Sequence, residues 1–430
     1  MGVSSLGVRR VLSPWCAGMV ALASGPHLNG DQFSGPTSYP RRLTCDPPQW
    51  SSLGTVHVAS GIPVYVERPR LLVRRGEWTL LGDTIIAWAP PTPISANPPS
   101  HLFAGRLRGT LLEPWPVPPG YLQPAMSPRS PRSIHGQIDQ AGRLVIVTAT
   151  GDSGGYLQSL VGKTGRWSKA ASSPTQPRIS WDPINPAVLA SEHATEVFLP
   201  VRSSDGTRSV RHFAVDSAGW HVRTTLPQVW AIYLRAIRLK DGTTILVFLS
   251  GDRQSPLPDR NSVFLSFLAP GSTTWSDPQV LSRSGAAGAE DPHLLQGSHG
   301  KVHLLWVAKS PAASATDTIR LLTSQDGGRN WTRQQAIAPG KAFRGLRASL
   351  APDGRLHLLV TDGDGYPTYA AFSGTSWSRP QRLPAQSAIP AALNVIDSTR
   401  LGVFITVLDS LSVSGAVVPT TQLLVGLLRC

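Results

Sequence analysis

The stretch SQDGGRNW, Ser324–Trp331, has the residue order of a tight polar turn that ends in a large apolar ring. Asp326 can accept hydrogen bonds from backbone N–H groups within the turn, and Gly328 can adopt the positive φ that such a turn needs. Trp331 would then bury its ring against a neighbouring layer of structure. The stretch is therefore predicted to be a structural turn between two strands.

The same ending recurs along the 430-residue chain at intervals of about 50 residues. The Trp residues that close polar turns are Trp115, Trp167, Trp220, Trp275, Trp331 and Trp377. Between them lie short runs of β-branched and large apolar residues, such as TILVFLS and VHLLWV, bounded by Gly, Pro, Asp or Ser. This pattern predicts an all-β protein in which each repeat is one four-stranded blade of a β-propeller.

A second turn precedes the most apolar strand of most repeats. The four turns are QAGR (140–143), KDGT (240–243), SHGK (298–301) and PDGR (352–355). Each Gly suits a tight hairpin between the innermost strand of a blade and its neighbour.

The two ends of the chain bear on the number of blades. The segment PPQWSSLGTVHVA, residues 47–59, resembles an outer strand that has no blade of its own. Strands also follow Trp377, but no Trp turn follows them. The simplest account is that the N-terminal strand completes the last blade, which gives seven blades; six is the alternative. The expected organisation is a signal peptide at 1–23, a linker at 24–44 and a propeller at 45–430.

The pattern Ser324-x-Asp326-x-Gly328-x-x-Trp331 resembles the Asp box, or BNR (bacterial neuraminidase) repeat, of the sialidase superfamily. The repeats that carry the resemblance cover roughly residues 60–430. The resemblance implies that the Asp-box turns lie on one face of the propeller and the ligand site on the other. It also implies a glycoside hydrolase with an exo-sialidase-like activity, although the catalytic sialidases have six blades.

The residues depart from the sialidase mechanism, which uses three arginines on the substrate carboxylate, an acid/base Asp and a Tyr–Glu nucleophile pair. Where the family has Arg-Ile-Pro on its first blade, this chain has Arg68-Pro69-Arg70. Only Arg235 and Arg347 match two members of the triad. The candidate nucleophiles, Tyr366 or Tyr369, are not anchored by a motif, so whether the chain is an enzyme stays open.

Candidate site residues follow from counting seven positions back from each turn glycine. This places His135, Arg235, His293 and Arg347 at one level of their inner strands. Glu290 and Asp291 precede His293 and are the candidate catalytic carboxylates. The approach loops supply the candidate substrate-binding residues Trp181, Trp230 and Tyr233. Arginines, acids and aromatic rings converging on a central funnel suit an acidic sugar; the alternative is a set of solvated channel-lining residues.

Two functional classes therefore remain. In one, the protein is a glycoside hydrolase acting on an acidic glycan; in the other, it is a non-catalytic propeller that binds glycan or protein. The loops of successive repeats, such as SGDRQSPLPDRNS and KSPAASATDT, do not repeat their residues. A multivalent lectin would repeat them, so the loops favour one asymmetric site.

The composition argues against several other classes. The net charge of +14 comes from 40 basic against 26 acidic residues, but the arginines are scattered rather than gathered in the stripe of a nucleic-acid binder. GDSGGY (151–156) resembles a serine-protease nucleophile motif, yet no matching His segment precedes it. No metal-binding motif and no phosphate-binding loop occurs, so no metal or cofactor is predicted.

The N-terminus, MGVSSLGVRRVLSPWCAGMVALAS, has the order of a secretory signal, and no later segment is long and apolar enough to span a membrane. The alternative is an ordinary buried N-terminal segment. Cleavage would remove Cys16 and leave Cys45 and Cys430, which are predicted to form a disulfide at the point of ring closure. We therefore expect an exported monomer without an integral membrane segment.

Overall fold

The structure is a computed structural model, and its described residues all belong to one unit, Leu43–Cys430. They are 46–58, 64–67, 70–74, 77–82, 84–87, 103–108, 110–114, 131–138, 143–150, 157–163, 166–168, 186–190, 195–203, 205–216, 219–250, 262–282, 288–310, 316–332, 335–340, 342–397, 400–413 and 416–429. The predicted signal peptide and linker, both cysteines of the predicted disulfide, Trp115, Trp181 and the GDSGGY loop lie outside these residues.

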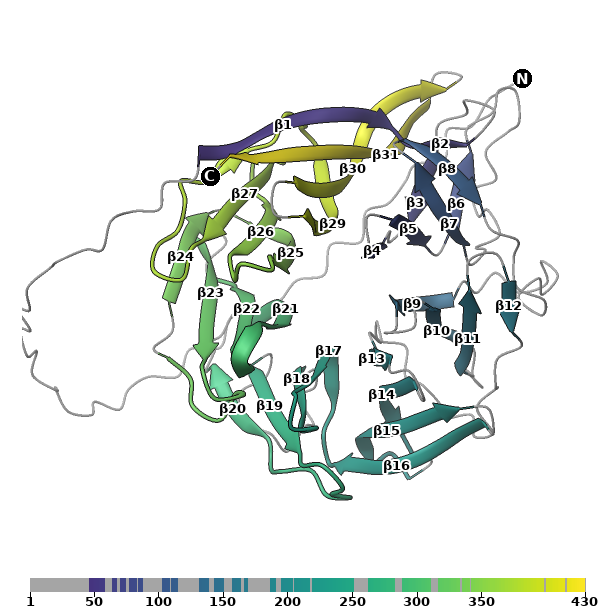
Figure 1. The fold of residues 1–430 in the computed structure, drawn as a ribbon, viewed down its shortest axis with the longest axis vertical. Coiled ribbons are helices and arrows are strands. Elements are labelled where there is room, and N and C mark those ends of the chain that lie inside the picture. The colour runs from purple at the N-terminus through teal and green to yellow at the C-terminus, as the bar shows by residue number, and fades with distance from the viewer. Residues whose placement is uncertain are drawn as a thin grey trace, which may run out of the picture. The chain divides into compact units, whose positions relative to one another are not determined.

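The described residues form antiparallel β-sheets, six of them four-stranded, and the all-β prediction is confirmed (Figure 1). The first sheet in the chain has five strands in the order β2-β8-β7-β5-β4, with one parallel pair, β2–β8, and a two-stranded sheet β3–β6 beside it in sequence. The strands of these two sheets are β2 (His57–Val58), β3 (Val64–Glu67), β4 (Arg70–Arg74), β5 (Glu77–Gly82), β6 (Thr84–Ala87), β7 (Phe103–Arg108) and β8 (Leu111–Pro114).

The next three sheets are meanders of four consecutive strands. The first contains β9 (Pro131–Ile138), β10 (Leu144–Thr150), β11 (Leu157–Lys163) and β12 (Arg166–Ser168). The second contains β13 (Ala187–Ala190), β14 (Thr195–Arg202), β15 (Arg208–Asp216) and β16 (Gly219–Pro227). The third contains β17 (Ala231–Arg238), β18 (Thr244–Ser250), β19 (Val263–Leu268) and β20 (Gln279–Ser282).

Two further meanders follow, and the last sheet takes a strand from the other end of the chain. The meanders contain β21 (Ala289–Gln296), β22 (Val302–Ala308), β23 (Asp317–Ser324) and β24 (Gln335–Gly340), then β25 (Arg344–Leu350), β26 (Leu356–Thr361), β27 (Pro367–Phe372) and β28 (Gln381–Arg382). The last sheet has the order β1-β31-β30-β29, formed by β1 (Asp46–Thr55), β29 (Ala388–Asp397), β30 (Arg400–Val413) and β31 (Ala416–Arg429). One 3-10 turn, η1 (Ser298–Gly300), precedes β22.

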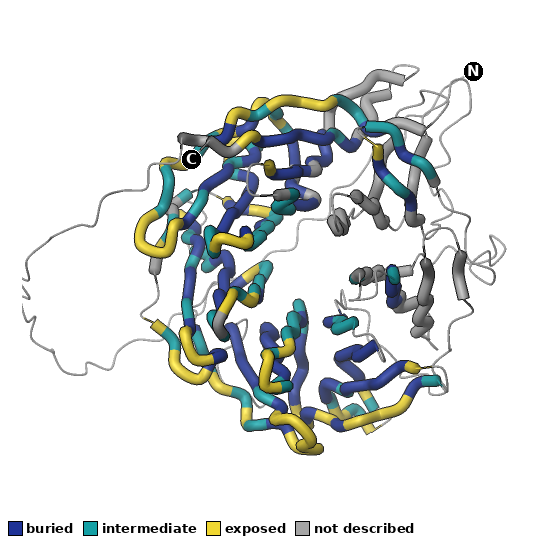
Figure 2. The backbone as a smooth tube through the Cα atoms, viewed as in Figure 1, coloured by how far each residue is buried: buried dark blue, intermediate teal, exposed yellow. Residues whose placement is uncertain are grey.

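One edge strand of each large sheet contacts the corresponding edge strand of the next sheet in turn. β4 contacts β9, β9 contacts β13, β13 contacts β17, β17 contacts β21, β21 contacts β25, β25 contacts β29, and β29 contacts β4. Sheets whose edge strands touch one another in such a closed order have the arrangement of a β-propeller. Sheet packing also explains the unbroken apolar runs of the second strands, because β18 and β26 are buried along their whole length (Figure 2).

Where its side chain is described, the Trp of an outer segment packs on the sheet that precedes its own. Trp220 lies in a buried cluster with Val147 of β10, and Trp275 meets Phe198 of β14 edge-to-face with ring centres 6.0 Å apart. In the last sheet, Trp50 of β1 meets Tyr369 of β27 in the same way, at 5.3 Å. Trp50 of β1 therefore makes, in the last sheet, the same inter-sheet contact that Trp220 and Trp275 make in theirs.

The turn Ser324–Trp331 has the predicted geometry. Ser324 Oγ donates to Oδ1 of Asp326 at 2.7 Å and accepts the N–H of Gly328 at 2.7 Å. Oδ1 of Asp326 also accepts the backbone N–H of Asn330 at 2.9 Å. Gly328 has φ +84°, and a Cβ there would lie 3.1 Å from Ile245 of the preceding sheet. Trp331 packs against the cluster that contains Ile245.

The hairpin glycines also match the prediction where they are described. Gly242, Gly300 and Gly354 have φ values of +85°, +76° and +84°. These turns lie at the same end of the sheets as the turn Ser324–Trp331, because β17, β21 and β25 run toward them and the third strands do the same. Among the described residues, we find no helix long and apolar enough to cross a membrane.

Candidate functional site

Three consecutive first strands carry the same irregularity near their beginning. In β17 the pairing with β18 shifts between Ile232 and Arg235, which face Leu249 and Val247. β21 shifts in the same way between Glu290 and His293, and β25 between Arg344 and Arg347. Each shift inserts one extra residue opposite its partner strand, which is a β-bulge. Bulges re-aim side chains and are frequent beside binding sites.

The bulges share an unusual backbone conformation. Tyr233, Asp291 and Gly345 occupy equivalent positions and have φ values of +52°, +47° and +63°. This left-handed region suits Gly and costs other residues free energy. Two of the three positions nevertheless hold a large or charged side chain, and such strain concentrates at functional sites.

Two arginines follow these bulges with the same local geometry. Nη1 of Arg235 donates to the carbonyl of Leu234 at 2.9 Å, and Nη1 of Arg347 donates to the carbonyl of Leu346 at 2.8 Å. Both leucines are fully buried, so each guanidinium is fastened to a rigid part of its bulge. The structure therefore holds the two predicted arginines in matching orientations on β17 and β25, the first strands of the two sheets on either side of the sheet of β21.

The charges of this region act on one another. Burial lowers the pKa of Arg235 to about 10, the Asp291 carboxylate opposes this change, and the charge of Arg347 adds to it. Burial also lowers the pKa of Arg347, and Asp291 again opposes the change. Two guanidiniums thus lie within electrostatic reach of each other and of one carboxylate. Both stay protonated near neutral pH, which leaves this trio with one net positive charge.

His293 connects two of the bulges. Its Nε2 donates to the carbonyl of Leu346 at 2.7 Å, so this carbonyl accepts from both His293 and Arg347. The three residues predicted to share one level, Arg235, His293 and Arg347, are indeed at equivalent bulge positions. The fourth, His135, pairs with Val147 in β9, and its side chain is not among those described.

Glu290 is held by a lysine that sequence reasoning missed. Nζ of Lys309 lies 3.2 Å from Oε2 of Glu290 and 3.1 Å from Oδ2 of Asp317, and it donates to the carbonyl of Phe343 at 2.6 Å. The buried Asp317 also accepts the backbone N–H of Phe343 at 2.9 Å. Lys309 follows an apolar strand directly, a position at which a lysine in the sequence could have been marked as a site candidate.

Of the aromatic candidates, Tyr233 lies in the site. It is partly buried, and burial raises its pKa, as do the carboxylates of Asp291 and Glu290. Both candidate catalytic carboxylates are therefore near its phenol.

The structure corrects the interpretation of Trp230. Trp230 is 2 % exposed, and the guanidinium carbon of Arg208 lies 4.5 Å from its ring centre. A sugar cannot stack on a ring face that is buried and covered in this way, so Trp230 stabilises the sheet packing instead. Trp181 lies outside the described residues.

The two tyrosines considered as nucleophiles make other contacts. Tyr369 is buried in β27, where its hydroxyl bonds Nδ1 of His357 at 2.7 Å. The guanidinium carbon of Arg382 lies 4.9 Å from the ring centre of Tyr366. Tyr233 is the tyrosine that the described structure brings to the carboxylates.

No family model matches the chain, and no curated protein matches it. Among solved structures, a polysaccharide lyase PL25-ulvan lyase bound to -[GlcA(1-4)Rha3S]- is 11% identical, with a TM-score of 0.46, over 61% of this chain and 74% of that chain. An α-L-arabinanase of Penicillium chrysogenum complexed with arabinobiose is also 11% identical, with a TM-score of 0.46, over 67% and 92%.

YCF48 bound to D1 peptide is 14% identical, with a TM-score of 0.44, over 90% of this chain and 98% of that chain. These similarities are too low to carry a conclusion about substrate or reaction.

Proposed function

We propose that residues 45–430 form a seven-bladed β-propeller, closed by its N-terminal strand, that binds an acidic glycan at the bulges of β17, β21 and β25. The observation that carries the proposal is the matched pair Arg235 and Arg347, each fastened to a bulge carbonyl and both sharing Asp291. Two shielded cations that repel each other gain most from a ligand that brings a negative charge between them.

The chemistry of the pair suits a sugar carboxylate. A guanidinium stays protonated at neutral pH and can donate two parallel hydrogen bonds to a carboxylate. Asp291 and Glu290 can accept hydrogen bonds from sugar hydroxyl groups, and Tyr233 presents a ring and a hydroxyl beside them. Because the three bulges carry different residues, they form one asymmetric site rather than repeated sites.

The binding test uses isothermal titration of glucuronate-containing and sialylated oligosaccharides, with neutral oligosaccharides for comparison. Replacing Arg235 or Arg347 by Ala should weaken binding of the acidic ligand by about 1.5–3 kcal/mol, the value of a charge-assisted hydrogen bond. Arg329→Ala is the control, because the Arg329 side chain is 71 % exposed in the turn Ser324–Trp331, at the other end of the sheets from the bulges. If Arg235→Ala and Arg347→Ala bind every acidic ligand like the wild type, the proposal is wrong.

Glycoside hydrolysis, of the exo-sialidase type or on another acidic glycan, is the second candidate. It is favoured by the position of two carboxylates, Glu290 and Asp291, beside one tyrosine, since carboxylates serve as acid and as nucleophile or base in such reactions. Product formation from the acidic ligands that bind, abolished by Glu290→Gln or Asp291→Asn with binding retained, would support it. Binding without turnover in the wild type would leave a non-catalytic glycan-binding propeller.

The proposal includes export as a monomer. Its support is the order of residues 1–23, a basic pair followed by an apolar run and small residues. N-terminal sequencing of the mature protein near residue 24, and a single monomer mass in solution, are the expected results.

A further inference from the structure

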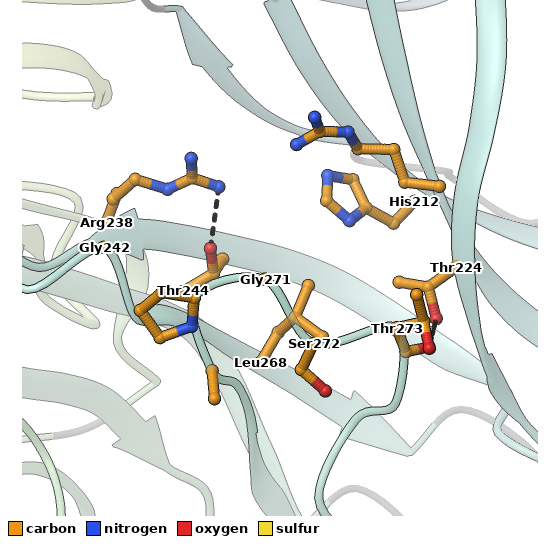
Figure 3. Close-up of a pocket in the computed structure, with 12 residues that line it drawn as sticks. His212, Thr224, Arg238, Gly242, Thr244, Leu268, Gly271, Ser272 and Thr273 are labelled. Carbon is orange, nitrogen blue, oxygen red and sulfur yellow. Dashed lines mark hydrogen bonds between the residues drawn. The ribbon is translucent and has the colours of Figure 1, made fainter.

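A second polar site lies at the end of β17 opposite to its bulge. It is a cleft of about 500 Å³ between the sheet of β13–β16 and that of β17–β20 (Figure 3). β16 contributes Arg223 and Thr224, β17 contributes Arg238, and the turn after β19 contributes Ser272 and Thr273. Arg235 is near the bulge of β17, whereas Arg238 ends the strand next to its hairpin turn, so the cleft is separate from the site proposed above.

The cleft has a charged floor, formed by the lining residues His212, Arg223 and Arg238 and backed by the buried Glu196. The Glu196 side chain is 8 % exposed, and its Oε2 accepts from Nε2 of His212 at 3.0 Å and from Arg238. Its Oε1 accepts a hydrogen bond from Nη1 of Arg223 at 3.4 Å. One carboxylate therefore faces two guanidiniums, which leaves a net positive charge on the floor even when His212 is neutral.

The guanidiniums retain donors for a ligand. Each arginine has five N–H donors. Within the described residues, Arg223 contacts Glu196 through Nη1 only. Nη2 of Arg238 donates to Glu196 and to the hydroxyl of Thr244, and its distance to the Thr244 oxygen is 2.9 Å. The Arg223 side chain is 56 % exposed, so its remaining donors are accessible from the cleft.

The opposite wall is a polar turn. Thr224 donates to the carbonyl of Thr273, which ties the wall to β16 (Figure 3). Ser272 Oγ donates to the carbonyl of Thr274 at 2.9 Å, and Gly271 has φ +72°. This closed turn fixes the width of the cleft, so that a ligand would meet a preformed wall rather than order a loop.

We propose that this cleft binds a small oxyanion, a carboxylate, sulfate or phosphate group, between Arg223 and Arg238. The buried Glu196 orients both guanidiniums, while the net positive charge selects an anion. The volume is sufficient for one monosaccharide-sized ligand that carries such a group. The site is independent of the bulge arginines.

The test titrates the full chain with inorganic phosphate, sodium sulfate and sodium glucuronate at constant ionic strength, with sodium chloride as the reference. Isothermal titration and the thermal midpoint are measured together. We expect saturable binding of at least one of the three anions, and Arg223→Gln should weaken it about tenfold by removing one charge-assisted contact. The anion bound most tightly identifies the class of group.

The controls separate the cleft from the surface and from the other site. Arg108→Gln is the control matched to Arg223→Gln, because Arg108 is also an exposed arginine paired with a carboxylate. Its side chain is 60 % exposed, and its Nε lies 3.2 Å from Oε1 of Glu113. This variant should bind the anion like the wild type. In an Arg235→Ala background, which weakens the bulge site, saturable anion binding should persist, and adding Arg223→Gln should weaken it. Loss of binding in Arg223→Gln alone supports the proposal. Equal binding by Arg223→Gln and wild type, or no saturable binding of any of the three anions, would overturn it.

Discussion

Tyr233, Asp291 and Gly345 show how single residues build the candidate site. All three have left-handed φ at the same bulge position, where a residue other than Gly costs roughly 1–2 kcal/mol. Tyr233 and Asp291 adopt this conformation despite its free-energy cost, which places a phenol and a carboxylate beside Arg235. At the third position Gly345 avoids the cost and contributes no side chain.

Gly345→Ala should lower the free energy of unfolding by roughly 1 kcal/mol, because Ala loses the freedom at positive φ that Gly has. Urea denaturation measures the effect. Gly297→Ala is the control, since the φ of Gly297 is −93° and a Cβ there makes an ordinary contact 3.4 Å from Leu350. An equal loss in both variants would contradict the role of the left-handed conformation.

Asp326 gives a pH dependence at the residue scale. Hydrogen bonds from the backbone and side chain of Asn330, and then from Ser324, lower its pKa from 3.8 to about 2. A depressed folded-state pKa contributes stability that is fully present above the unfolded pKa and is lost as the pH falls through the folded pKa.

Asp326→Asn should therefore reduce the thermal midpoint at pH 7, and the gap between variant and wild type should narrow as the pH falls from about 4 to about 2. Thermal unfolding followed by circular dichroism at several pH values measures it. The exposed Asp277→Asn is the control. A gap that stays constant over this pH range would show that the Asp326 carboxylate is not the stabilising group.

At the scale of elements, the sheets are held together by one large ring per outer segment. Trp50, Trp220, Trp275, Trp331 and Trp377 each pack against a cluster that includes the preceding sheet. Between β14–β16 and β17 the contact also includes the buried Glu196 network. The apolar ring provides buried area, and the ion cluster adds directional hydrogen bonds between the same two sheets.

Trp275→Ala should cost about 3–5 kcal/mol of unfolding free energy, the range for truncating a buried aromatic residue. Trp275 is 6 % exposed and packs edge-to-face on both Phe198 and His212. Denaturant unfolding measures the loss, with the exposed Val222→Ala as control. A loss below about 1 kcal/mol would mean that the ring does not hold the two sheets together.

At the scale of the whole molecule, β1 and β31 join distant parts of the sequence in one sheet. Their described pairing begins with Asp46 opposite Arg429 and extends to Thr55 opposite Gln422. Trp50 adds a hydrogen bond from Nε1 to Oε1 of Gln381, at 3.1 Å. Unfolding this sheet therefore releases both ends of the described chain together.

A disulfide between Cys45 and Cys430 stays a prediction, since both residues lie outside the described part. Its support is the register, because the residues that follow Cys45 and precede Cys430 are cross-strand partners. In the chain-entropy model a bridge that closes so long a loop contributes roughly 4–5 kcal/mol. Peptide mapping of the exported protein under non-reducing conditions should find the linked peptides, and Cys430→Ser should lower the unfolding midpoint. Free thiols at both positions would exclude the bridge.

The sequence by itself determined the local features of this protein. The turn Ser324–Trp331, the hairpin glycines and the apolar strands follow from residues close together in the chain, whose conformational preferences are set by their neighbours. The equivalent strand positions of Arg235, His293 and Arg347 can also be predicted from the sequence, because counting residues back from a turn glycine needs only the regular geometry of a strand. The outer-strand character of residues 47–55 was indicated by Trp50, whereas residues 57–58 pair with β8 of another sheet.

Only the tertiary structure decided which side chains meet across sheets. Lys309 reaches Glu290 and Asp317, Arg208 covers Trp230, and Arg223 joins Glu196 in the cleft. The left-handed Tyr233 and Asp291 were equally hidden, since neither residue type predicts that conformation. These features depend on burial and charge contributed by distant segments, and the energies that select them arise only when the sheets pack together.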